Sequence, residues 1–215
     1  MASWSALLAQ EERDRAGRFR LEADRERHIY GRGLLRELAA AYLGCLPGAL
    51  EFVYTANGKP ELTRLPGQRR LGFNLSHSGN RLLLAFAWDR EVGVDVELLR
   101  TDVEIRQIAE RFFSQHEQQT LLSLGKNEQI PAFFRCWTRK EAYVKAVGEG
   151  LSLPLSQFDV TLRPGEPARL LATRPDLREA SRWALWNLDL GADYAAALAV
   201  PTEELSCERS LTKGD

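Results

Sequence analysis

Several residue types that often reveal a protein's class are scarce in this sequence. It has only three cysteines, which are odd in number and widely spaced. They form neither a disulfide framework nor a zinc-binding pattern, and this usage is typical of a reducing cytosol. No apolar run reaches the about 18 residues that span a bilayer, and residues 1–20 are charged and lack the apolar segment of a signal peptide. We therefore expect a cytoplasmic protein without a membrane-spanning segment.

The chain also lacks an excess of charge of either sign. Its 29 basic and 30 acidic residues give a formal charge of −1. Nucleic-acid-binding proteins usually carry a basic excess, so we expect no nucleic-acid partner. The composition over 215 residues, 44% hydrophobic and 27% charged, is typical of a globular protein. This length suits one large domain or two of roughly 100 residues.

Lysine is rare because arginine fills most basic positions. Only five of the 29 basic residues are lysine, and lysine is retained where a planar guanidinium cannot replace a compact ammonium. Three of the five, Lys59, Lys140 and Lys145, fall in segments that suggest chemistry. Arginine is densest in residues 13–36, which contain eight arginines and four acidic residues. This segment is either a solvated, salt-bridged helix surface or an anion-binding face.

The hydrophobic pattern predicts both helical and extended segments. We expect helices over residues 18–45, 102–113, 114–124 and 130–147. We expect a turn at residues 76–80 and a hairpin that joins residues 81–88 to residues 91–98 around Asp89 and Arg90. Further strands are expected over residues 72–75, 158–162, 182–189 and 194–200.

The order helix, strand, hairpin occurs twice, in residues 20–98 and 128–200. We infer an α+β fold of two similar lobes in a pseudo-twofold arrangement, residues 1–100 and 101–205, with a frayed tail at 206–215. The cleft between two such lobes is a common place for an active site. Because one chain holds both lobes, we expect a monomer.

Two acidic residues alternate with valines in the segment 92–98. On a strand, this alternation places Asp95 and Glu97 on one face, about 6.5–7 Å apart along the backbone. A half-buried strand with its acids toward water would show the same pattern. Two carboxylates that converge from one strand also suit a hard divalent cation.

A third acidic residue stands in the middle of an apolar helix face. At 100° per residue, Glu141 falls at the centre of an apolar arc that Lys140 and Lys145 flank. A carboxylate there is costly unless it is paired or bound to a metal. Either an ion pair with Lys145, four residues further on, or a metal site would therefore explain Glu141. The arc consists of Ile130, Phe133, Phe134, Trp137 and Val144.

Small polar residues and a histidine precede both acidic segments in the sequence. The segment 73–79 contains His77, one of three histidines, beside Ser76 and Ser78. Such groups can hydrogen-bond a phosphate, and Lys59 adds a point charge. The sequence has no GxxxxGK[ST] loop, GxGxxG fingerprint or GxSxG elbow. Three acids with scattered cations predict metal-assisted transfer at a polyphosphate ester.

Five segments together resemble the 4′-phosphopantetheinyl transferase superfamily, in its larger, surfactin-synthetase-activating type, whose single chain holds two similar halves. The resemblance runs from Arg18 to about Phe158, and its most specific parts are the last segment and the third. The segments are Gly58-Lys59-Pro60, Phe73-Asn74-Leu75-Ser76-His77-Ser78, Gly93-Val94-Asp95-Val96-Glu97, Phe112-Phe113-Ser114 and Trp137-Thr138-Arg139-Lys140-Glu141-Ala142-Tyr143-Val144-Lys145.

The resemblance implies a reaction and its partners. The 4′-phosphopantetheine arm of coenzyme A would pass to a serine of an apo acyl or peptidyl carrier protein, with release of 3′,5′-ADP. Asp95, Glu97 and Glu141 would hold Mg²⁺. Glu141, directly or through a metal-bound water, would be the base, and Lys145, helped by Lys140, would neutralise phosphate charge.

The same resemblance implies phosphate contacts to coenzyme A from Arg27, Lys59, Ser76 and His77. Glu97, Glu141 and Lys145 would form the catalytic set. The residues alone leave two other interpretations open. A Mg²⁺-dependent hydrolase of phosphate esters would use the same acids with a positioned water, and a non-catalytic module would bind nucleic acid or another anion through residues 13–36.

Overall fold

The computed structural model describes residues 2–64, 67–174 and 176–202. Cys207 and the tail expected at residues 206–215 lie outside the described residues. Within the described residues, no helix is both long and apolar enough to cross a membrane.

The N-terminal half is built from helices followed by two hairpins. Its long helix ends at Leu43, because Gly44 adopts a left-handed conformation with φ of 65°. Its elements are α1 (Ala2–Leu7), α2 (Gln10–Ala16), α3 (Glu22–Leu43), the short 3₁₀ helix η1 (Pro47–Ala49), β1 (Phe52–Tyr54), β2 (Pro60–Leu62), β3 (Leu71–Ser78) and β4 (Arg81–Trp88).

The C-terminal half is centred on a second long helix, α6 (Lys126–Val147). Gly148, with φ of 81°, ends this helix as Gly44 ends α3. The other elements are β5 (Gly93–Leu98), α4 (Ile105–Phe112), α5 (Gln115–Ser123), η2 (Gly150–Ser152), η3 (Leu155–Gln157), β6 (Phe158–Val160), β7 (Leu170–Thr173), η4 (Glu179–Arg182), β8 (Trp183–Asn187) and β9 (Tyr194–Pro201).

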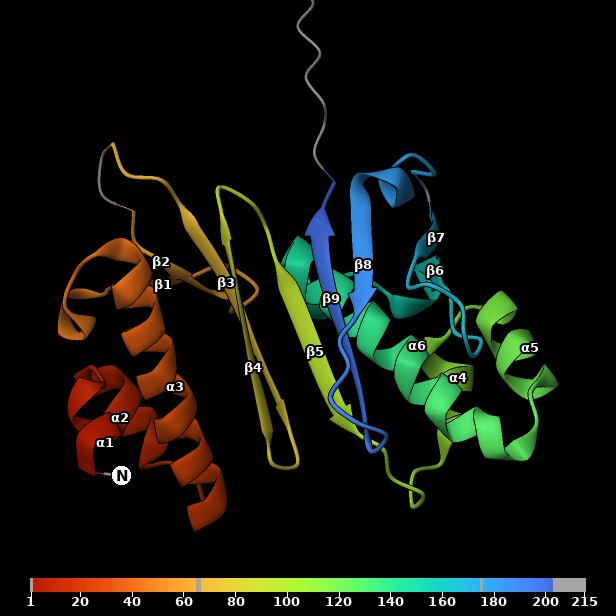
Figure 1. The fold of residues 1–215 in the computed structure, drawn as a ribbon, viewed down its shortest axis with the longest axis horizontal. Helices are drawn as coiled ribbons and strands as arrows, with labels where there is room; N and C mark the ends of the chain where they lie inside the picture. Colours follow the sequence, from red (N-terminus) through yellow and green to blue (C-terminus); the bar gives the residue numbers. More distant parts are fainter. Residues whose placement is uncertain (1, 65–66, 175, 203–215) are drawn as a thin grey trace, which may run out of the picture.

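Each half packs its long helix against antiparallel strands. β3 pairs with β4, whereas β5, β9 and β8 form a sheet in that order, and β1–β2 and β6–β7 are small separate hairpins. Figure 1 shows these main strands in the middle of the molecule, with α1–α3 at one end and α4–α6 at the other. The expected α+β fold of two lobes is confirmed.

The expected hairpin between residues 81–88 and 91–98 is wrong. β4 pairs with β3 along its whole length, from Leu71 opposite Trp88 to Ser78 opposite Arg81, and β5 pairs with β9. Residues 76–78, expected in a turn, continue β3, so the turn is confined to Gly79 and Asn80. Small polar residues such as Ser76 and Ser78 are typical of turns, but here their side chains contact β5.

The expected division of the chain at residue 100 stays a prediction, and the sheet pairing suggests another one. Because β5 belongs to the sheet of the C-terminal half, a boundary at residue 100 separates β5 from β8 and β9. We propose that the halves meet instead at the connection between β4 and β5, near residues 89–92. Asp89 has a left-handed φ of 55° in this connection.

β3 and β5 are joined by hydrogen bonds from backbone N–H groups of β5 to side chains of β3, not by a ladder of backbone hydrogen bonds. Asn74 Oδ1 accepts a hydrogen bond from the Val94 N–H at 2.9 Å. The hydroxyls of Ser76 and Ser78 accept from the N–H groups two and four residues further along β5, at 3.3 and 3.0 Å. This polar seam, formed by Asn74, Ser76 and Ser78 with β5, joins the two halves.

A glycine allows α6 to lie unusually close to β5. A Cβ atom at Gly93 would stand 2.0 Å from the Ala142 carbonyl oxygen and 2.4 Å from the Ala146 nitrogen, both backbone atoms of α6. The main core fills the rest of this interface and includes Phe133, Tyr143 and Phe158. The close approach places the last turns of α6 directly beside the acidic residues of β5.

Candidate active site

The predicted acidic residues line one cavity at the junction of the two halves. The cavity has a volume of about 370 Å³. β3 contributes one wall, β5 contributes Asp95 and Glu97, and α6 contributes Glu141 and Lys145. This location is the cleft between lobes that we expected for the active site. The lining residues are Leu75, Ser76, His77, Asp95, Glu97, Trp137, Glu141 and Lys145.

Asp95 is the most tightly held of the three carboxylates. Its Oδ1 lies 2.6 Å from Lys145 Nζ and accepts a hydrogen bond from the Ser76 hydroxyl at 2.8 Å. Its Oδ2 is buried and has no hydrogen-bond partner among the described residues. The ion pair that we considered between Glu141 and Lys145 is therefore replaced by a pair between α6 and β5.

Burial makes all three carboxyl groups hard to ionise, and repulsion adds to this effect at Glu97 and Glu141. Burial raises the pKa of Asp95, although Lys145 acts in the opposite direction. Burial is also the main cause that raises the pKa of Glu97 and of Glu141, and the charge of Asp95 adds to both shifts. One lysine is therefore too little positive charge for three neighbouring carboxylates.

The donor set fits a divalent cation, although it is not arranged around one. Among residues 2–64, 67–174 and 176–202, no three His, Cys, Asp or Glu side chains are grouped closely enough to hold a metal ion. Yet Asp95 leaves a buried carboxylate oxygen without a partner, and hard cations prefer such oxygens. Asp95, Glu97 and Glu141, which line the same cavity, would hold the ion.

The raised pKa values give a testable pH dependence of stability. The folded protein favours the protonated forms, so the stability that these groups contribute is fully present below their ordinary pKa of about 4. That stability is lost as the pH rises through the raised folded values. A bound cation would offset the loss. We expect the increase in melting temperature caused by Mg²⁺ to be small near pH 5 and larger near pH 8.

Calorimetric melting curves, with KCl at equal ionic strength as the control, would measure this effect. An increase that Mg²⁺ and KCl produce equally, or one independent of pH, would contradict the proposed metal site.

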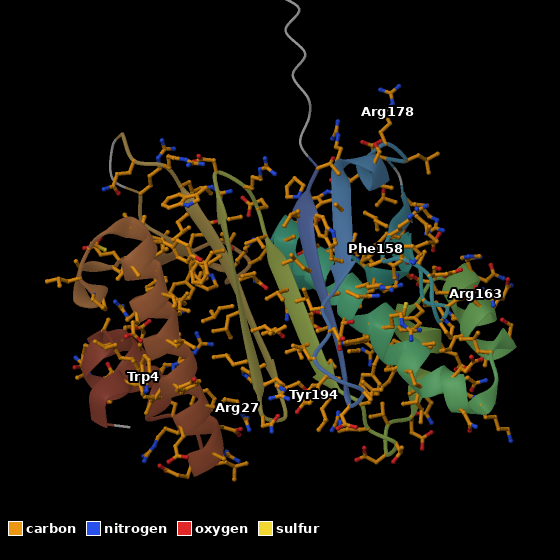
Figure 2. The ribbon with its side chains drawn as sticks, viewed as in Figure 1. Trp4, Arg27, Phe158, Arg163, Arg178 and Tyr194 are labelled. Atoms are coloured by element: carbon orange, nitrogen blue, oxygen red, sulfur yellow. The ribbon has the colours of Figure 1, made fainter. Side chains whose placement is uncertain are left out.

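His77 and Arg27 lie at the outer side of the cavity. His77 lies on β3 with much of its surface open to solvent. Partial desolvation of its ring, followed by the charges of Arg27 and Lys145, lowers the pKa of its imidazole. Arg27 pairs with Asp24 at 2.8 Å, and both side chains are partly exposed. In Figure 2, Arg27 lies on the lower part of α3, toward the end where β3 turns into β4. A phosphate that approaches from solvent would meet the Arg27 guanidinium and the imidazole of His77.

Ser76 and Lys59, two of the expected phosphate contacts, are engaged within the protein. Ser76 gives its only donor to Asp95 and accepts from Val96 N and Lys145 Nζ. Lys59 Nζ lies 3.1 Å from Glu91 Oε2 and donates to the Ala146 carbonyl near the end of α6, also at 3.1 Å. The Ser76 hydroxyl has no donor left, and Lys59 does not line the carboxylate cavity but the adjoining one.

Lys140 is not brought to the cavity at all. It is 0% exposed and pairs with Glu117, also 0% exposed, at 2.8 Å. Its Nζ also donates to the carbonyl oxygens of Leu155 and Phe158. A buried pair of this kind is stable only with such further hydrogen bonds. Lys140 thus links α6 to α5, to η3 and to the start of β6. We leave it out of the proposed site.

Two larger hollows adjoin the carboxylate cavity. One, of about 580 Å³, shares Trp137, Glu141 and Lys145 with it and continues past Phe112 and Leu155 between the halves. The other, of about 760 Å³, lies between the first helices and β3. Three arginines of the arginine-rich segment, Arg15, Arg18 and Arg32, line it. These hollows can accept an elongated ligand with charged and apolar parts.

Sequence reasoning missed Ser78 and the arginines that line the hollow between the first helices and β3. Ser78 donates to Glu97 Oε2 at 2.7 Å, but the expected turn at residues 76–80 concealed its place on a strand. The period-two spacing of Asn74, Ser76 and Ser78 was the available signal. The arginine-rich segment was recognised as a possible anion-binding face, but no pattern indicated which of its residues face inward.

The fold and the site together define a two-lobed α+β protein suited to metal-assisted chemistry on a phosphate ester. Residues 91–199 match the sequence model of the 4′-phosphopantetheinyl transferase superfamily, and residues 1–88 match that of the 4′-phosphopantetheinyl transferase N-terminal domain. The chain belongs to the 4′-phosphopantetheinyl transferase superfamily, as the resemblance in the sequence indicated.

Similar proteins extend over most of the chain. The 4′-phosphopantetheinyl transferase HetI of Nostoc sp. is 39% identical over 91% of this chain and 79% of its own length. The 4′-phosphopantetheinyl transferase psf-1 of Bacillus pumilus is 34% identical over 96% of this chain and 88% of its own. The 4′-phosphopantetheinyl transferase Sfp of Bacillus subtilis is 31% identical over 91% and 84%.

Proposed function

We propose that this protein transfers the 4′-phosphopantetheine arm of coenzyme A to a serine of an apo acyl or peptidyl carrier protein, with Mg²⁺ as cofactor. The observation that supports this most directly is the group Asp95, Glu97, Glu141 and Lys145 around one cavity at the junction of the halves. Family membership supports the reaction, and it weakens the alternatives of a hydrolase and of a non-catalytic anion-binding module.

The reaction forms one P–O bond and breaks another. The serine oxygen of the carrier attacks the pyrophosphate phosphorus that bears the pantetheine arm, and the bond to 3′,5′-ADP breaks. Glu141 takes the serine proton, directly or through a water molecule. Mg²⁺, when bound by Asp95, Glu97 and Glu141, supplies positive charge to the pyrophosphate.

The other residues of the junction bind and orient coenzyme A. Lys145 lies beside Asp95 and faces the same cavity, so it neutralises charge that develops on the phosphate oxygens. His77 and Arg27 contact the phosphates of the nucleotide from the exposed side. The hollow past Trp137 and Phe112 has the apolar walls that suit the pantetheine arm.

The intact mass of an apo carrier protein tests the proposal. After incubation with this protein, coenzyme A and Mg²⁺, the carrier should gain the mass of one phosphopantetheine arm, and EDTA should prevent the gain. No gain across several unrelated carriers, with protein shown to be folded, would overturn the proposal. An equal gain in EDTA would overturn the metal requirement alone.

We further propose a cytoplasmic monomer, which the absence of a disulfide pattern and the two lobes of one chain support.

Lys145→Arg should impair transfer although the charge is kept. Lys145 Nζ fits between Asp95 Oδ1 at 2.6 Å and Ser76 Oγ at 3.1 Å. A planar guanidinium is larger and cannot replace this point donor. We expect kcat/KM for coenzyme A to fall by about 10- to 100-fold, which corresponds to one misplaced electrostatic contact. Steady-state kinetics would measure this, and unchanged kcat/KM would refute a specific role for Lys145.

A further inference from the structure

Two serines of β3 contact β5 in the same way. The Ser76 hydroxyl accepts from the Val96 N–H at 3.3 Å and donates to Asp95 Oδ1 at 2.8 Å. The Ser78 hydroxyl accepts from the Leu98 N–H at 3.0 Å and donates to Glu97 Oε2 at 2.7 Å. Each hydroxyl thus holds a carboxylate and the backbone N–H of the next residue on β5.

The repeat follows from strand geometry. Side chains two residues apart on β3 point to the same side, and so do carboxylates two residues apart on β5. A hydroxyl has one donor and two acceptor positions, so it can connect a carboxylate to a backbone N–H and still have an acceptor position left. Ser76 uses that position for Lys145 Nζ at 3.1 Å.

We propose that Ser76 and Ser78 are positioning residues that fix the carboxylates of Asp95 and Glu97 for metal binding. This proposal rests on the proposed metal site. Each serine occupies one oxygen of its carboxylate and leaves the other free to bind the ion. In Asp95, the second oxygen has no hydrogen-bond partner among the described residues. Hydrogen-bonded partners of metal ligands commonly orient them in this way.

Asn74, the third polar residue of the seam, provides a control. It distinguishes orientation of the carboxylates from simple attachment of the two halves. Asn74 Oδ1 accepts from the Val94 N–H at 2.9 Å, but the preceding residue, Gly93, has no carboxylate for it to hold. Loss of the Asn74 side chain removes a contact between β3 and β5 and leaves both acids as they are. Loss of the Ser78 hydroxyl removes a similar contact and frees Glu97 as well.

The test measures metal binding directly, apart from transfer. Mn²⁺ is titrated into the full-length protein with coenzyme A present, and free Mn²⁺ is counted by electron paramagnetic resonance. For Ser78→Ala, we expect the dissociation constant for Mn²⁺ to rise by about 10- to 100-fold. Ser78→Thr keeps the hydroxyl and should restore tight binding. Asn74→Ala should lower the melting temperature but leave the dissociation constant within about twofold of wild type.

The possible outcomes separate this proposal from the proposed function. Equal Mn²⁺ affinity in Ser78→Ala and wild type, or an equal loss in Asn74→Ala, would overturn the positioning role. Failure of the wild type to bind Mn²⁺ would overturn it together with the metal site. If the wild type binds Mn²⁺ but transfers no phosphopantetheine, the proposed reaction fails. The Mn²⁺ affinities of the serine variants would then still decide the positioning role.

Discussion

Replacing Glu141 with glutamine is expected to lower the rate of transfer by about 100-fold or more, while the protein remains folded. Glutamine has nearly the same shape as glutamate, but it cannot accept the serine proton and is a poorer metal ligand. Glu141 is half-buried in the cavity and forms no hydrogen bond or ion pair with the described residues. We therefore expect the substitution to change the free energy of unfolding little and the rate of transfer strongly.

The charges in the cavity allow loss of a catalytic group to be distinguished from a loss of activity caused by unfolding. The charges of Asp95 and Glu97 both raise the pKa of Glu141. Removing one of three repelling carboxylates should leave the melting temperature without Mg²⁺ unchanged or slightly higher. The gain caused by Mg²⁺ should then shrink, because one proposed ligand is lost.

Glu128→Gln is the matched control, since Glu128 is exposed in the first turn of the same helix. We expect it to transfer at the rate of the wild type. Initial rates of carrier modification, followed by intact mass, would compare both variants. Wild-type rates in Glu141→Gln, with Mg²⁺ still required, would refute the assignment of Glu141.

Replacing Gly93 with alanine is expected to destabilise the protein by about 3 kcal/mol or more, a large effect for one methyl group. The added Cβ would overlap backbone atoms of Ala142 and Ala146, which cannot rotate away as a side chain can. α6 would have to move away from β5. Glu141 and Lys145 would then move away from Asp95, so transfer should fall together with stability.

Gly48→Ala is the control for the glycine substitution itself. A Cβ at Gly48 meets no atom within 4 Å, and we expect its effect on stability to be below about 1 kcal/mol. Chemical denaturation of both variants would give the free energies of unfolding. A loss in Gly93→Ala no larger than that in Gly48→Ala would contradict the close approach of α6 to β5.

The acidic site could be predicted from sequence because each part has a strong local pattern. Period-two alternation placed Asp95 and Glu97 on one face, and a helical projection placed Glu141 in an apolar arc. Both patterns depend only on the geometry of a single element. The two-lobed fold was predicted from the repeated order of elements, although the first hairpin in that order was wrong. The resemblance to a known family supplied the reaction, which no pattern of charge or spacing contains.

The errors arose where a residue's partner lies on another element. A helical projection puts Lys140 beside Glu141, but it cannot show that Glu117 of α5 holds Lys140 in the core. The segment 76–78 has the composition of a turn, but its serines satisfy the free N–H groups of β5. Pairing of β5 with β9, about 100 residues away in the chain, likewise has no local signal.

The polar seam also affects how the protein behaves in a crowded solution. A strand that pairs on one side only has a free edge, and free edges recruit strands from other molecules and promote aggregation. β5 lies at such an edge of the β5–β9–β8 sheet, but Asn74, Ser76 and Ser78 occupy its N–H groups. The protein can therefore keep an acidic strand next to an open cavity without offering that strand as a template for self-association.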